Sequence, residues 1–237
     1  MKDDASLTRE EAREASGEDP VVTLRAACEG LAGVVAGLGD EESWLPTGCA
    51  GWAVRDLVFH CLSDVQRGLV ALHTPADGPP DRDAVTYWRD WRPDRAGAAH
   101  ERRWARVGAS MFPDFGPLRE SYVETAAAVV VAATEADPER RVGTQGHVLT
   151  TRDMLATLAV EAAIHHLDLV VALPDAPGPA AAGLAAVRTT LDGLLGRPVP
   201  VDWDDAHYAR AATGRAPLTD AERRVLGPDL ARFPLLG

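Results

Sequence analysis

The 237-residue chain is long enough to bury a full hydrophobic core, and its 46% apolar content is that of an ordinary globular protein. Because the net charge is -12, we expect no nucleic-acid partner and no binding to anionic lipid. No stretch reads as the roughly 18-residue apolar run of a membrane span. The polar, acidic N-terminus has no signal-peptide core, so the prediction is a cytoplasmic protein.

The first predicted elements are a solvated leader and two helices. Residues 1–18 are polar and charged, which favours a leader outside the core. Asp19-Pro20 is a typical helix start, with Asp as the N-cap and Pro at the first helical position, and Gly39 ends the apolar stripe. After a turn-rich segment, a second helix is expected over 54–72.

The middle of the chain predicts a long loop and two further helices. Residues 73–97 contain several prolines and glycines and an aromatic cluster, and loops this long are often functional. A helical pattern covers 98–111 and, after breaks at Pro113 and Pro117, resumes over 118–136.

The C-terminal half is predicted to be mainly helical. Residues 138–149 form a connector in which 147–149 could be extended, and Thr150 opens a helix near 151–173 in a capping-box-like sequence. Three shorter helices follow, near 180–195, 204–212 and 220–226. Because no set of alternating strands is visible, we predict an all-α fold. A four-helix bundle would span 19–175, and a short helical C-terminal extension, 176–237, would pack on it.

The helix at 151–173 carries the chemistry. It is apolar almost all round, as buried helices are. One polar line nevertheless runs along it at spacings of four, four, four and three residues, made of Asp153, Thr157, Glu161, His165 and Asp168. A buried carboxylate is costly unless it is paired or binds a metal. Glu161 and His165, one turn apart, present an oxygen and a nitrogen to one point, as a divalent ion requires.

A third ligand has to come from another element, and His60 on the second apolar helix is the best candidate. Three protein ligands leave open positions for water or substrate, as in catalytic sites. Each residue has an ordinary alternative. His60 could be a core histidine paired with Asp56, and Glu161 with His165 could be a simple helix pair. Asp168 and His166 could support a ligand from behind, although His166 points away and could equally be a packing residue.

The three cysteines Cys28, Cys49 and Cys61 show no CxxC spacing. Neither a disulfide framework nor a four-cysteine zinc site is therefore expected, and small core residues are the simplest interpretation.

Three phrases carry a family resemblance. TGCAGWAVRDLVFH, from Thr47 to His60, resembles a signature of the mycothiol-dependent maleylpyruvate isomerase N-terminal family, within the DinB-like superfamily. TLAVEAAIHHLDL, over 157–169, is similar to that family's E-x-x-x-H-x-x-D helix, and TGRAPLTDAERRVLG with FPLL, over 213–236, is similar to the C-terminal end of many members. The resemblance implies a DinB-like four-helix bundle with a metal held by His60, Glu161 and His165.

The resemblance also implies an activity. A metal-dependent thiol transferase or isomerase would use mycothiol as cosubstrate, with the ion favouring the thiolate. The ion is expected to be zinc, with nickel, iron or manganese as alternatives. Arg215 or Arg152 could contact the cosubstrate. Because the larger mixed C-terminal appendage of the isomerase itself is missing, we do not expect maleylpyruvate to be the substrate.

Two other functions stay open on the same site. A hydrolase would use the ion to activate water, with His166 or Asp168 as base, although no HExxH motif is present. The second alternative function is that of a non-catalytic protein that binds a metal or another ligand. The expected partners are a small thiol and a small electrophile, and the expected assembly is a monomer or a homodimer.

Overall fold

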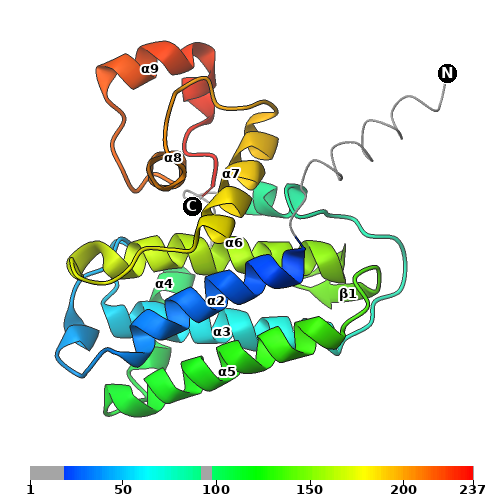
Figure 1. Cartoon of the computed structure of the whole chain (residues 1–237), viewed down its shortest axis with the longest axis vertical. Helices are drawn as coiled ribbons and strands as arrows, with labels where there is room; N and C mark the ends of the chain where they lie inside the picture. The colour runs from blue at the N-terminus through cyan, green and yellow to red at the C-terminus, as the bar shows by residue number, and fades with distance from the viewer. Residues whose placement is uncertain (1–18, 92–97, 237) are drawn as a thin grey trace.

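The computed structural model describes residues 19–91 and 98–236 and confirms the all-α prediction (Figure 1). The leader predicted over 1–18 and the end of the loop predicted over 73–97 lie outside the described residues. The α-helices are α2 (Pro20–Ala36), α3 (Val54–Leu72), α4 (Ala98–Ala109), α5 (Phe115–Glu135), α6 (Thr151–Leu169), α7 (Ala181–Leu195), α8 (Asp205–Ala212) and α9 (Asp220–Leu226). The short 3-10 helices are η1 (Glu42–Trp44), η2 (Thr86–Asp90), η3 (Val170–Ala172) and η4 (Gly227–Arg232), and the strands are β1 (Arg141–Thr144) and β2 (His147–Thr150).

The bundle consists of α2, α3, α5 and α6, which run side by side in Figure 1. Helix α2 packs against α5 and α6, and α3 packs against the same two helices on its own side. Leucine, valine and alanine side chains fill the space between them, and α6 is buried on nearly every face. The apolar stripes of the sequence therefore all turn toward one shared core.

Local capping chemistry accounts for where the helices begin. The Asp19 carboxylate accepts from the backbone N–H of Val21 at 2.9 Å, and the Thr150 side chain caps α6. The predicted capping box at Thr219 is present before α9. Gly37 rather than Gly39 caps the end of α2, so this boundary was wrong by two residues.

One expectation about the middle of the chain is corrected, and another is extended by the structure. Pro117 does not interrupt α5 but lies in its first turn, where a missing backbone N–H breaks no helical hydrogen bond. The connector over 138–149 contains an antiparallel hairpin, and the stretch near 147–149 that could be extended is its second strand, with Thr144 opposite His147. Its turn residues Gln145 and Gly146 have φ values of 51° and 82°, which suits a two-residue turn with both residues left-handed.

The described part of the loop predicted over 73–97 is packed rather than free. Pro75 pairs with Val142 of β1, and the backbone N–H of Asp81 donates to Val148 of β2. Helix η2 follows and buries Tyr87 and Trp88. The loop is therefore fixed to the hairpin, on the side of the bundle where α3 meets α6.

The C-terminal helices cover one side of the bundle. Helix α7 packs on α6 and α2, α8 packs on α7, and α9 lies beyond them (Figure 1). Among the described residues, one helical stretch, Thr151–Ala172, is long and apolar enough to span a membrane, contrary to the sequence expectation. Most of that stretch is buried inside the bundle, as in the core helix of a soluble protein.

Candidate metal centre

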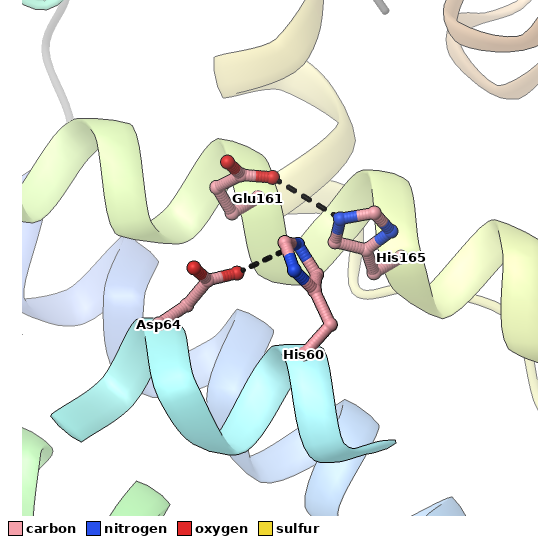
Figure 2. Close-up of side chains that lie close together, drawn as sticks. All are labelled: His60, Asp64, Glu161 and His165. Atoms are coloured by element: carbon pink, nitrogen blue, oxygen red, sulfur yellow. Dashed lines mark ion pairs between the residues drawn. The ribbon is translucent and has the colours of Figure 1, made fainter. Parts of the chain in front are cut away.

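Two helices of the bundle bring four donor side chains together. His60 and Asp64 lie one turn apart on α3, and Glu161 and His165 lie one turn apart on the facing helix α6 (Figure 2). One ligand atom from each of the four residues lies within 4.8 Å of all the others. The three residues expected as ligands from the sequence thus face one point, and Asp64 joins them.

Each histidine of the cluster faces a carboxylate on its own helix. His60 Nε2 lies 3.1 Å from Asp64 Oδ2, and His165 Nε2 lies 3.3 Å from Glu161 Oε2. The two imidazole rings meet edge to face, with centroids 4.7 Å apart. Both Nε2 atoms and both carboxylates therefore turn toward the space between the helices.

Asp168 holds the ring of His165 from behind. His165 Nδ1–H donates to Asp168 Oδ2 at 3.1 Å, which leaves Nε2 on the side of the cluster. This arrangement of carboxylate, imidazole and open Nε2 is the one that metal-binding histidines usually adopt. Asp168 is only 1% exposed, and its own charge is balanced by Arg215, whose Nε–H donates to Oδ1 at 2.6 Å. The sequence prediction that Asp168 supports a ligand agrees with this geometry.

Gly48 and Cys49, in the segment before α3, pack against Asp168. Cys49 Sγ donates to Asp168 Oδ2 at 3.1 Å, and the backbone N–H of Gly48 donates to the Asp168 carbonyl at 2.9 Å. A Cβ added at Gly48 would lie 2.3 Å from Asp168 Oδ1, so only glycine fits there. The TGC part of the first family phrase therefore has a structural role, which is close packing on the end of α6.

Burial and mutual charge set the protonation of the two histidines. Burial, together with the nearby His165, lowers the pKa of His60 to about 3, so its imidazole is neutral near pH 7. Burial also acts to lower the pKa of His165, but hydrogen bonds with Asp168, Cys49 and Glu161 outweigh it and raise that pKa well above 6.5. His165 is therefore the proton-carrying member of the pair.

The two α6 carboxylates beside His165, those of Glu161 and Asp168, are ionised. Burial acts to raise the pKa of Glu161, but the hydrogen bond and charge of His165 lower it to about 2. Burial opposes ionisation of Asp168 as well, and His165 and Arg215 overcome it and hold the Asp168 pKa far below 3.8. The α6 side of the cluster thus presents an anionic oxygen and a histidine whose proton can be displaced.

The four donors fit a divalent transition-metal ion. Two imidazole nitrogens with carboxylate oxygens are a ligand set suited to zinc, iron, nickel or manganese. Asp64 Oδ2 is buried without a hydrogen bond of good geometry, although His60 Nε2 lies 3.1 Å away. A buried carboxylate oxygen in that state is expensive and is relieved by coordination to a cation.

Asp64 is the residue that sequence reasoning missed. It follows His60 by four residues, the same spacing that singled out Glu161 and His165, and that spacing was the available signal. Asp56, considered instead as the partner of His60, accepts from the backbone N–H of Ala53 at the start of α3. Arg67 forms an ion pair with Asp64 Oδ1, which leaves Oδ2 turned toward the cluster.

Three other candidates do not reach the donor cluster. His166 Nε2–H donates to the Pro177 carbonyl at 2.9 Å, and its ring lies beside Gly30 of α2. Arg152 pairs with Glu139 on the surface. Arg215 is close, but it is committed to Asp168, so its role in the described structure is to hold that aspartate.

Only the last part of the predicted polar line on α6 belongs to the cluster. Asp153 bonds to Thr150 at the start of the helix, and the Thr157 hydroxyl donates to the Met154 carbonyl. The hydrolase alternative also loses support. Of the two residues considered as its base, His166 faces away and Asp168 is held by three partners.

Comparison with known proteins identifies the family of the chain. A family model described as the mycothiol maleylpyruvate isomerase N-terminal domain matches residues 24–170, which is more than half of the chain. Searches of curated proteins and of solved structures gave no match. The matched region contains α3, α6 and all four donors. The chain therefore belongs to the mycothiol maleylpyruvate isomerase N-terminal domain family, and it is a mycothiol-related, DinB-like protein with a candidate metal site.

Proposed function

We propose that this protein is a divalent-metal-dependent enzyme that activates a low-molecular-weight thiol of the mycothiol type. The thiol would be transferred to a small electrophile or used to isomerise it. The observation that carries the proposal is the convergence of His60, Asp64, Glu161 and His165 in a family related to mycothiol. A bound divalent ion acts as a Lewis acid and favours the thiolate over the thiol near neutral pH.

Each residue of the cluster would have a separate role in binding such an ion. His60 is neutral and offers Nε2 without losing a proton. Glu161 supplies a negative charge, and His165 has to release its Nε2 proton. Asp168 keeps the His165 ring in one orientation through Nδ1. Asp64 would supply the fourth donor through Oδ2, the oxygen that faces His60 Nε2.

The approach to the cluster is narrow. A cavity of about 20 Å³ borders Asp64 and Glu161, which is room for about one water molecule. Arg67 and Tyr87 also line it, so η2 of the loop singled out in the sequence forms part of its wall. His60 and Glu161 keep 26% of their side-chain surface exposed, and the residues that line the cavity beside them are the first place to look for substrate specificity.

Metal analysis tests the ligand assignment. Wild-type protein loaded with zinc and desalted should retain about one ion per chain, and His60→Ala and His165→Ala should each lose most of it. His73→Ala is the matched control, because His73 is an exposed histidine just beyond the end of α3. Equal metal content in all four proteins would show that the ligand set is wrong.

A turnover assay tests the chemistry. Mycothiol is mixed with a panel of small electrophiles, and both the free thiol and the electrophile are followed with zinc-loaded and metal-free protein, because an isomerisation returns the thiol. The proposal expects acceleration by the loaded protein for at least one electrophile and none by the loaded Glu161→Gln variant. If metal binds but no electrophile reacts faster, the assignment of thiol activation fails while the metal site stands.

A further inference from the structure

A second cavity lies apart from the donor cluster and belongs to none of the chemistry above. Its volume is about 780 Å³, it lies between α4 and the segment around η1, and none of the four donor residues lines it. Small-molecule sites usually have about 300–1,000 Å³. The lining includes four arginines, which are Arg55, Arg102, Arg103 and Arg106.

Arg55 is a buried cation whose described contacts are with neutral groups. It is 5% exposed, and its guanidinium stacks over the Trp44 ring with Cζ 4.3 Å from the ring centroid. Nη2–H donates to the Phe112 carbonyl at 2.6 Å, which fixes the side chain, but Nε is buried with no hydrogen-bond partner. Within the described parts of the chain, no carboxylate pairs with Arg55. A buried charge in this state is costly until an anion joins it.

The arginines of α4 add to this charge. Arg102, Arg103 and Arg106 are exposed, and none forms an ion pair with a described residue. Asp56 is the one acidic residue among the described residues of the lining, and its carboxylate already accepts from the backbone at the start of α3. Four cations therefore gather around one cavity in a chain whose net charge is -12. Guanidinium groups are well suited to bidentate binding of carboxylate and phosphate.

The cavity also offers apolar surface. Trp44 is 62% exposed and Val107 is 59% exposed, and both line it. Exposed large apolar side chains beside arginines that form no ion pair with the described residues are what a ligand with a charged head and an apolar body requires. An inorganic ion would leave that apolar surface in water.

We infer that this cavity is a binding site for a small organic anion. A carboxylate or phosphate head would contact Arg55 and the α4 arginines, and an aromatic or aliphatic body would lie on Trp44 and Val107. The site is joined to the donor cluster through Trp52, whose Nε1–H donates to the Arg102 carbonyl at 3.2 Å and whose ring packs on His60 at 5.1 Å. The inference does not depend on the proposed thiol chemistry.

Calorimetric titration of the metal-free protein tests the inference directly. The probes are phenyl phosphate and 3-phenylpropionate, with inorganic phosphate and neutral benzyl alcohol as comparisons. Wild type should bind at least one aryl anion saturably. Arg106→Gln and Trp44→Leu, both surface changes, should weaken that binding by roughly tenfold or more. Arg55→Met should also weaken it, provided that circular dichroism shows a folded protein.

The matched control is Arg224→Gln on α9, which removes the same charge from an exposed position that does not line the cavity. It should leave binding unchanged. The inference is overturned if neither aryl anion binds saturably, or if Arg224→Gln weakens binding as much as Arg106→Gln does. Equal affinity for inorganic phosphate would overturn the role of the apolar surface, and equal affinity for benzyl alcohol would overturn the role of the arginines.

Discussion

Replacement of Arg215 by alanine tests how the C-terminal extension supports the metal centre. Arg215 lies outside the region matched by the family model, yet its guanidinium balances the buried Asp168 carboxylate that orients His165. Removing it leaves a carboxylate that is 1% exposed without its cation. The ring of His165 then loses a firmly placed partner.

The expected loss of unfolding free energy in Arg215→Ala follows from the burial of the ion pair. Arg215 is 16% exposed, and breaking a buried ion pair by removing one partner costs roughly 3–5 kcal/mol. Because His165 and Cys49 still donate to the other Asp168 oxygen, we expect a loss of about 3 kcal/mol in unfolding free energy, at the lower end of that range. Loss of support behind a ligand histidine typically weakens metal affinity by about 10–100-fold.

Urea denaturation of the metal-free protein and zinc titration measure the two effects. The control is Arg197→Ala, because Arg197 is 53% exposed and pairs with Asp229 at the surface, where such pairs contribute about 0–1 kcal/mol. Arg215→Lys should recover part of the stability but less of the zinc affinity, since lysine lacks the planar fork. If Arg215→Ala is no less stable than Arg197→Ala and binds zinc as wild type does, the reasoning is refuted.

The Arg215–Asp168 pair also predicts how the unfolding free energy changes with pH. The pKa of Asp168 is held below its ordinary value of 3.8, so its contribution to stability is present above that value and is lost as the pH falls through the folded pKa. Arg215→Ala raises that pKa. The stability difference between wild type and variant should therefore be full at pH 7 and should shrink below about pH 4. A difference that grows on acidification would contradict this assignment.

Three further predictions concern zinc binding and the buried cysteines of the bundle. Gly48→Ala should weaken zinc binding at least about tenfold, because its Cβ would lie 2.3 Å from the buried aspartate, whereas Gly33→Ala, with open space around it, should not. Zinc affinity should fall as the pH falls through and below neutrality, with proton release on binding, because the pKa of His165 is raised; a flat profile between pH 6 and 8 would count against that proton. Cys28 and Cys61, whose pKa values burial raises to about 12, should stay unlabelled by a thiol reagent in the native protein at pH 8, and rapid modification of either would show that the core is more open than described.

What could be predicted from sequence rests on local interactions. The bounds of α3 follow from the period of its apolar residues, and the start of α6 follows from the cap at Thr150. The pairing of Glu161 with His165 is local as well, because residues four apart on a helix share a face whatever surrounds it. His60 required more than spacing, since several histidines were available and the family phrase selected it.

The rest depended on which faces meet in three dimensions. Asp64 becomes a candidate ligand only when α3 lies against α6, and the Arg215–Asp168 pair joins residues 47 apart in the chain. The cavity around Arg55 forms because α4 folds back beside η1, which no local pattern reveals. Periodicity and capping thus determined the helices and half of the donor set. Only tertiary packing decided the fourth donor, the cation behind His165 and the second cavity, because each depends on contacts between segments whose local sequences carry no information about one another.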